Sequence, residues 1–131
     1  MEAILQFLKD CKTFYIATMD GDQPRVRPFG AVCSIGGKLY ICANNKKLVA
    51  QQIRANPKIE ISATSEDRRW LRLTAEAIVD DRREAREAML DALPNLRNMY
   101  SADDGLYEVY YLRNATGVIN SFGGENEVHT F

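Results

Sequence analysis

Two arginines stand two positions apart in the segment PRVRPFG, residues 24–30. In an extended chain alternate side chains share one face, so Arg25 and Arg27 would lie about 7 Å apart on the same side. Two like charges at this separation repel each other unless an opposite charge offsets them. Either the arginines are solvated or paired with acidic residues such as Asp20, or they bind an anion.

A second basic element lies in the segment NNKKL. Lys46 and Lys47 precede a predicted short helix over residues 48–55, and Pro57 follows that helix. The free N–H groups at a helix N-terminus favour an anion, and an arginine offers a planar fork of donors. We therefore predict that the two basic elements converge on one phosphate group. A solvated helix start is the alternative for the lysines.

Other reactive side chains are few. The chain has a single histidine, His129, which is too few for a histidine-based metal cluster and leaves little basis for a Ser/His/Asp site. We therefore predict no metal centre. Cys11, Cys33 and Cys42 are odd in number and lack the spacing of metal or redox motifs. Unpaired thiols favour a reducing compartment, and we expect the cytoplasm.

Composition narrows the class of protein. The chain has 131 residues, enough for one domain with a sizeable core, and 46% of them are hydrophobic. The net charge is −1, which leaves no broad basic surface for nucleic acid. No apolar run reaches membrane-spanning length, and residues 1–12 show helical spacing with charges rather than a secretory signal. We expect neither a nucleic-acid partner nor a membrane partner.

Most of the remaining chain shows the pattern of β-strands. The segments with this pattern are residues 13–19, 24–35, 38–43, 58–63, 70–79, 106–112 and 115–122. Turns are predicted at residues 20–22, 36–37 and 113–114. A hairpin turn at 36–37 would place Cys33 opposite Tyr40 and only diagonal to Cys42, so a disulfide there would need a shifted register.

Three helices are predicted between the strands, over residues 1–12, 48–55 and 81–94, with Asp81 as the N-cap of the last and Pro94 at its end. The strands follow one another without regular strand–helix alternation, which argues against a parallel sheet. We predict a mainly β (α+β) fold: a six- to seven-stranded antiparallel barrel or strongly curved sheet with short helices outside. Open edges of such a sheet favour closure or dimerisation.

The order of these motifs resembles the pyridoxamine 5′-phosphate oxidase-like family, the FMN-binding split barrels. The resemblance rests on FYIATMDGDQPRVRPFGAV, LYICANNKKLVAQQIRANPKIEI, WLRLTAEA and ATGVINSFGGENEV. It implies a single FMN-binding split-barrel domain over residues 1–131 and a homodimer with noncovalent FMN at the subunit interface. The sequence is most similar to short single-domain members. It lacks the longer C-terminal region that true pyridoxamine phosphate oxidases use for substrate, so no substrate is implied.

The resemblance also implies particular site residues. Arg27 matches the family arginine that meets the FMN phosphate or ribityl chain, and Pro28 and Phe29 match residues whose backbone borders the flavin. Lys47, helped by Lys46, matches the phosphate-binding lysine.

Ala43 stands where many relatives have a threonine, and Asn44 and Asn45 occupy the tight approach to the lysine loop. Trp70 matches a family side chain that reaches the flavin ring from the second protomer. The candidate cofactor-binding residues are Arg25, Arg27, Pro28, Phe29, Ala43, Asn44, Asn45, Lys46, Lys47 and Trp70.

The function implied is that of an FMN-dependent oxidoreductase, which passes hydride or electrons from a nicotinamide or similar donor to a small organic acceptor. No catalytic side chain is assigned, because the flavin ring carries this chemistry. Two alternatives stay open. One is a non-catalytic module that carries or senses FMN, a deazaflavin or haem, and the other is a cofactor-free dimeric interaction domain.

Overall fold

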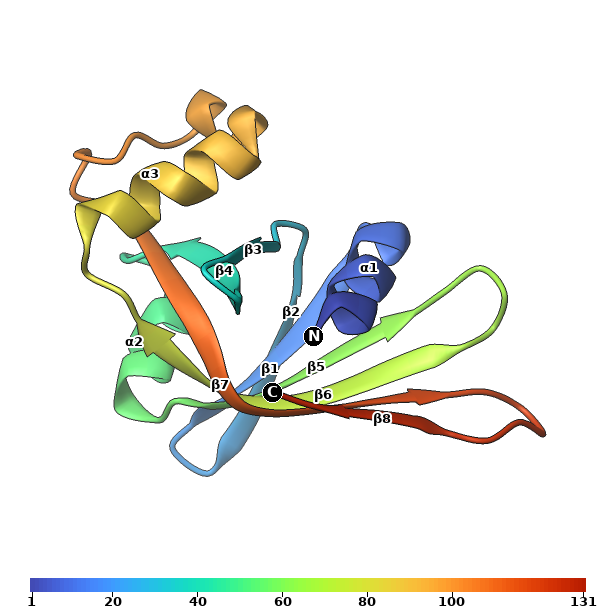
Figure 1. Cartoon of the computed structure of the whole chain (residues 1–131). Coiled ribbons are helices and arrows are strands. Elements are labelled where there is room, and N and C mark those ends of the chain that lie inside the picture. Colours follow the sequence, from blue (N-terminus) through green and yellow to red (C-terminus); the bar gives the residue numbers. More distant parts are fainter.

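A single antiparallel sheet curls on itself and forms the body of the molecule (Figure 1). The computed structural model describes residues 1–131. Its strands are β1 (Phe14–Asp20), β2 (Gln23–Phe29), β3 (Cys33–Ile35), β4 (Lys38–Asn44), β5 (Lys58–Thr64), β6 (Trp70–Val79), β7 (Tyr107–Asn120) and β8 (Glu127–Thr130). The order across the sheet is β2-β1-β5-β6-β7-β4-β3, and β8 also pairs with β7. The predicted mainly β, antiparallel split-barrel class is confirmed.

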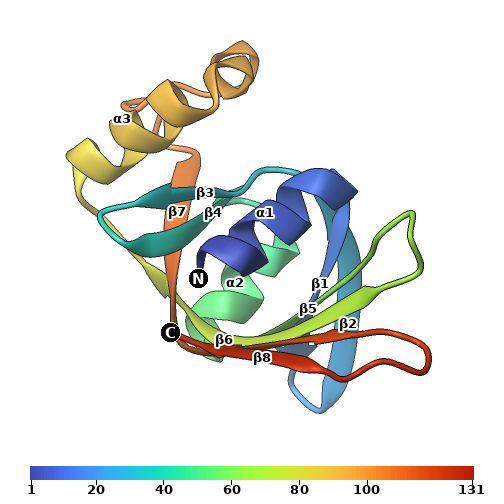
Figure 2. The ribbon, with the colours of Figure 1, turned by 45° about the vertical axis from the view of Figure 1, so that its right-hand side comes forward.

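The helices pack around this sheet. They are α1 (Glu2–Cys11), α2 (Leu48–Ala55), α3 (Arg83–Ala92) and the short 3-10 helix η1 (Pro94–Asn98). Figure 2 looks into the barrel, with α1 in front of it and α2 behind. None of these helices combines the length and the apolar character that a membrane crossing requires.

The barrel core follows from period-two alternation along its strands. On β6, Leu71 and Leu73 are buried while Arg72 and Thr74 face outward. Helix α1 adds Ile4 to this core, where it lies against β7. A Cβ atom at Gly117 of β7 would approach the Ile4 Cδ1 atom to 2.6 Å, so the absence of a side chain at Gly117 makes room for α1.

Several predicted boundaries were wrong. The predicted turn at 113–114 does not form, because β7 continues through these residues. Its pairing with β6 shifts register at this point, between Thr74 and Glu76 of β6. Asn114 adopts a φ of 49°, which a short polar side chain tolerates, and the chain makes a bulge instead of a reversal.

The segment 24–35 is two strands rather than one, since residues 30–32 leave the sheet. Strand β8 was not predicted, because it is short and has no apolar run. The strand number is therefore eight instead of six or seven. Asp81 does not cap α3, whose N-cap position is Arg82.

The predicted hairpin at 36–37 is confirmed: Gly36 and Gly37 both have positive φ, and Cys33 pairs with Tyr40. All three cysteines are free thiols.

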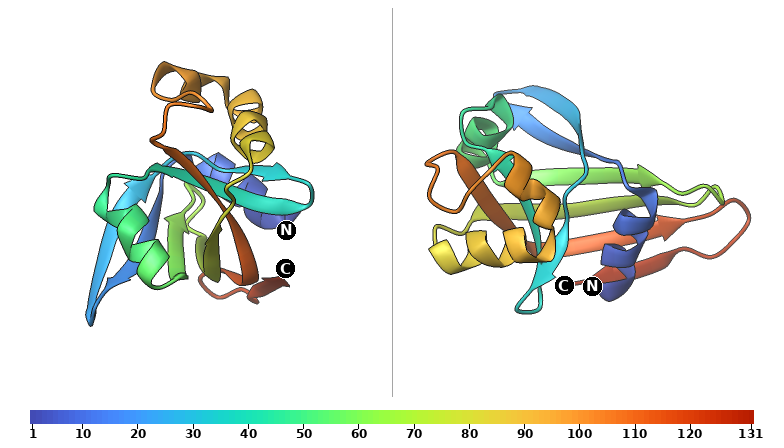
Figure 3. Two further views of the ribbon diagram at one scale, coloured as in Figure 1. Left: turned by 90° about the vertical axis from the view of Figure 1, so that its left-hand side faces the viewer. Right: turned by 90° about the horizontal axis from the view of Figure 1, so that it is seen from above.

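Helices α3 and η1 form a separate layer above one end of the barrel (Figure 3). A second cluster of ten buried residues holds this layer against β3, β4 and the start of β7. Its largest fully buried contributors include Tyr40 and Met89. The two cores leave a cleft between the barrel rim and η1.

Candidate functional site

A cleft of about 1000 Å³ lies between the barrel and the helical layer. Four segments line it: the end of β2 with the following loop, the end of β4, the start of α2, and the segment around η1. The lining residues are Arg27, Pro28, Phe29, Gly30, Ala31, Cys42, Ala43, Asn44, Lys46, Lys47, Leu48, Val49, Leu93, Asn95, Leu96, Met99 and Tyr100. The volume is at the upper end of the range for small-molecule sites.

The charges in this cleft are all of one sign. Arg27, Lys46 and Lys47 line it, and no aspartate or glutamate does. None of the three cations forms a salt bridge, whereas Arg25, Arg54, Arg69, Arg72, Arg82, Arg83, Arg97 and Arg113 all pair with carboxylates. The cleft therefore keeps positive charge that the protein itself does not neutralise, and an anionic group would offset it.

Arg27 is held by neutral groups. Its Nη1 donates to Thr18 Oγ1 at 2.7 Å and its Nη2 to Gln52 Oε1 at 2.7 Å. The Thr18 hydroxyl in turn donates to Gln52 Oε1 at 2.6 Å. Partial burial, followed by the charge of Arg25, lowers the pKa of Arg27 from its ordinary value, because both disfavour the cation.

The N-terminus of α2 adds backbone donors. Lys47 is its N-cap, and no side chain caps the helix. The Ala50 N–H is the first to bond within the helix, to Lys47 O at 3.1 Å, while the N–H groups of Leu48 and Val49 donate to no acceptor in the protein. These free N–H groups favour an anion at this end of the cleft.

The loop before α2 is tightly closed. Asn44 Oδ1 accepts the Lys46 N–H at 2.9 Å, and the Asn45 N–H donates to Leu106 O at 2.8 Å. These bonds hold the two lysines at the mouth of the cleft, beside the free N–H groups of α2.

The rest of the cleft is apolar. Leu93, Leu96, Met99 and Tyr100 form the wall on the η1 side. The Tyr100 ring stacks on Tyr107 with 4.9 Å between ring centroids, which gives this wall a rigid backing. A ligand with an anionic end and a flat apolar end matches this division.

The structure separates the two arginines of PRVRPFG. Arg25 lies outside the cleft, 54% exposed at its side chain, and its Nε donates to Asp20 Oδ2 at 3.2 Å. Arg27 points into the cleft rim without an acidic partner. The interpretation as a paired surface charge is thus correct for Arg25, whereas anion binding stays a prediction for Arg27.

Seven of the ten candidate residues line the cleft together: Arg27, Pro28, Phe29, Ala43, Asn44, Lys46 and Lys47. Besides Arg25, two others lie elsewhere. Asn45 donates through Nδ2 to Gly105 O at 2.9 Å and faces a smaller polar depression. Trp70 packs on Phe122, with ring centroids 5.1 Å apart, where the β5–β6 and β7–β8 hairpins leave the barrel.

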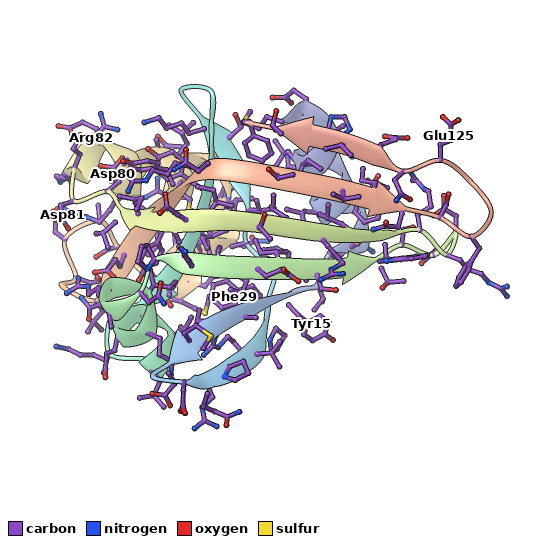
Figure 4. The ribbon with its side chains drawn as sticks, turned by 90° about the horizontal axis from the view of Figure 1, so that it is seen from below. Tyr15, Phe29, Asp80, Asp81, Arg82 and Glu125 are labelled. Atoms are coloured by element: carbon purple, nitrogen blue, oxygen red, sulfur yellow. The ribbon has the colours of Figure 1, made fainter.

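Figure 4 shows how side chains are distributed around the sheet. Tyr15 lies at the outer margin of β1, and Phe29 lies nearer the centre of the molecule. Asp80, Asp81 and Arg82 gather at the end of the molecule opposite the hairpin that carries Glu125. No three His, Cys, Asp or Glu side chains come together as metal ligands.

Sequence reasoning missed two groups of residues. The η1 wall was missed because residues 93–100 show no periodic pattern, and an irregular segment carries no local signal of its position. Thr18 and Gln52 were missed as partners of Arg27, although a signal existed: Gln52 is a polar residue in the buried stripe of α2 beside Val49 and Ile53.

Comparison with known proteins places the chain in a family. The family model of pyridoxamine 5′-phosphate oxidase matches residues 1–112. The chain belongs to the pyridoxamine 5′-phosphate oxidase family. No curated protein matches this family member significantly in sequence.

Solved structures extend the comparison. A NimC/NimA family protein from Clostridium acetobutylicum is 53% identical, with a TM-score of 0.98 over 100% of this chain and 92% of that one. General Stress Protein 26 from Bacillus anthracis has a TM-score of 0.77 at 14% identity, covering 99% and 97%. A pyridoxamine 5′-phosphate oxidase-related, FMN binding protein from Nostoc punctiforme has a TM-score of 0.69 at 14% identity, covering 99% and 95%. At 14% identity, these last two share the fold alone.

Proposed function

We propose that this protein binds FMN noncovalently in the cleft and acts as an oxidoreductase. The observation that carries the proposal is the cleft's unneutralised charge: Arg27, Lys46 and Lys47 line it without any acidic residue. A phosphate monoester would neutralise these cations, and a flat ring system would cover the apolar surface beside them. Membership of a family with an FMN binding relative supports the same ligand.

The residues of the cleft fit the two ends of FMN. Arg27, the two lysines and the free N–H groups of Leu48 and Val49 would hold the phosphate. The backbone of residues 28–30 and the η1 wall would border the flavin ring and exclude water from it. Bound FMN would supply two-electron chemistry between a nicotinamide or similar donor and a small organic acceptor.

We also propose a homodimer, with Trp70 reaching the cofactor of the partner. Large apolar side chains that are exposed in the single chain support it, because contact with a second subunit would remove them from water. They include Tyr15 of β1, Val26 of β2, Val128 of β8 and Phe122 of the β7–β8 turn, of which Phe122 is 82% exposed. The three free thiols support a cytoplasmic location. The proposal treats residues 1–131 as one FMN-binding domain.

The absorbance spectrum of the purified protein tests the proposal. It should be recorded before and after addition of FMN, each time after a desalting column. Retained flavin bands would establish binding, and a colourless protein would contradict the proposal. Reduction of the bound flavin by NADH or NADPH faster than that of free FMN would support an enzyme, whereas tight binding without it would identify a carrier or sensor.

Replacement of Lys47 tests the lysine end of the cleft. We expect Lys47→Ala to weaken FMN binding about tenfold, roughly 1.5 kcal/mol, because one charge-assisted hydrogen bond to the phosphate is lost. Fluorescence titration of FMN would measure the change. Lys9→Ala, which removes an exposed lysine of α1 outside the cleft, is the matched control. Equal dissociation constants for Lys47→Ala and the control would discard Lys47 as a ligand.

A further inference from the structure

Arg27, Thr18 and Gln52 form a closed ring of hydrogen bonds. Arg27 donates to both partners, and Thr18 donates to Gln52, with all three distances between 2.6 and 2.7 Å. The direction of each bond is determined, because Thr18 Oγ1 already accepts from Arg27 and must give its own proton to Gln52 Oε1. Thr18 is 2% exposed and Gln52 7% exposed, so water does not replace these bonds.

The ring leaves one edge of the guanidinium free. Nη1 donates to Thr18 Oγ1 at 2.7 Å and lies within reach of the backbone oxygens of Ile16 and Arg25, at 3.3 and 3.4 Å, and one proton of Nη2 is used by Gln52. The Nε–H of Arg27 donates to no acceptor in the protein, and neither does the second proton of Nη2. Two adjacent N–H groups on one edge of an arginine are the arrangement that binds two oxygens of a phosphate.

The partners of Arg27 differ in kind from those of Arg54 and Arg82. Arg54 and Arg82 are held by buried carboxylates, Glu108 and Asp80, which neutralise them. Arg27 is held by an amide oxygen and a hydroxyl, which orient the guanidinium and leave its charge unchanged. A charge that is oriented but not neutralised remains available to an anionic ligand.

We propose that Gln52 is a positioning residue: with Thr18 it aims the free edge of Arg27 at a phosphate monoester, preserves the positive charge, and so makes the cleft select FMN over riboflavin. This proposal rests on the proposed function. It assigns a role to two buried side chains that do not line the cleft and would not touch the ligand.

The test compares FMN with riboflavin, which lacks the phosphate, in wild type and in variants of one position. Gln52→Glu keeps the length and shape of the side chain but places a carboxylate against Arg27. We expect FMN binding to weaken about tenfold, because the carboxylate neutralises the cation and repels the phosphate, while riboflavin binding stays unchanged. Gln52→Met keeps the volume without an acceptor, and should weaken FMN about threefold with riboflavin again unchanged.

Gln51→Glu is the matched control. Gln51 is the exposed neighbour of Gln52 on α2, so this variant adds the same charge to the same helix without contact to Arg27. It should leave the ratio of the two dissociation constants within about twofold of wild type. Thermal unfolding of each variant would show that the fold is intact.

The outcomes separate the two proposals. A wild type that retains neither flavin would remove the proposed function itself. A wild type that binds FMN, with Gln52→Glu changing FMN and riboflavin affinity by the same factor, would reduce Gln52 to a structural residue and overturn the inference alone. The same loss of selectivity in Gln51→Glu would also overturn it, since the effect would then be one of net charge and not of positioning.

Discussion

Replacement of Arg27 by alanine is expected to weaken FMN binding by at least about a hundredfold, roughly 3 kcal/mol, the larger of the two changes predicted for the cationic end of the cleft. The free edge of the guanidinium offers two charge-assisted hydrogen bonds to one phosphate, where Lys47 offers one. Arg27 has no carboxylate partner, so its removal leaves no unpaired buried anion, and Thr18 and Gln52 keep the hydrogen bond to each other. Fluorescence titration with FMN would measure the dissociation constant.

Arg25→Ala is the control for this variant. It removes the same charge from the same face of β2, but its side chain is paired with Asp20 and lies outside the cleft. We expect its effect on FMN binding to stay below about threefold, the weak influence of a screened surface charge. If Arg25→Ala and Arg27→Ala weakened FMN equally, the cleft would be the wrong place for the phosphate. If neither had an effect, the protein would fit the cofactor-free alternative.

Replacement of Asp80 by alanine is expected to lower the free energy of unfolding by about 2 to 4 kcal/mol. Asp80 joins the end of β6 to α3. It accepts the Tyr40 hydroxyl at 2.7 Å and two bonds from the Arg82 guanidinium at 2.9 and 3.0 Å. Tyr40 is 2% exposed, so its hydroxyl would be left buried and unpaired. Chemical denaturation would measure the change, and Asp81→Ala, at the exposed neighbour, should have little effect.

The contribution of Asp80 should depend on pH in a defined direction. The hydrogen bonds from Arg82, aided by that of Tyr40, hold the pKa of this carboxyl well below its usual range in the folded protein, against the opposing effect of burial. A depressed folded pKa means that the stabilisation is fully present above the unfolded pKa of about 3.9 and is lost as the pH falls below it. The difference in unfolding free energy between wild type and Asp80→Ala should therefore be constant near neutral pH and shrink in acid. A difference that did not change with pH would contradict the role of the ionised carboxylate.

The local pattern of apolar and polar residues was enough to predict most of the fold. The strands at residues 58–63 and 70–79 and the helix at 48–55 agree closely with β5, β6 and α2, because the periodicity of buried positions is a property of each segment alone. Errors arose where the tertiary context overruled a local signal. Asn114 resembled a turn residue, yet pairing with β6 on one side kept β7 continuous and reduced the turn to a bulge.

For the candidate site, too, the sequence predicted what is local and missed what depends on tertiary contacts. Residue type and resemblance brought out Arg27, Lys46 and Lys47 as candidates for a phosphate, since cations and a helix start are visible in the sequence itself. The sequence could not separate Arg25 from Arg27, because the two have the same side chain, the same strand and the same face. Their difference comes from Asp20 across the hairpin and from Gln52, which is 25 residues from Arg27 along the chain.

The sequence by itself thus determined the kind of fold, the boundaries of its most regular elements and the basic residues available to an anion. Only the tertiary structure decided that Arg27 keeps a free edge and an unneutralised charge, that the N–H groups of Leu48 and Val49 have no acceptor, and that η1 closes the apolar side of the cleft. The physical reason is that charge type and periodicity are encoded locally. The partners that orient a charge, or leave it without a counter-ion, are set by long-range packing between β1, β2 and α2.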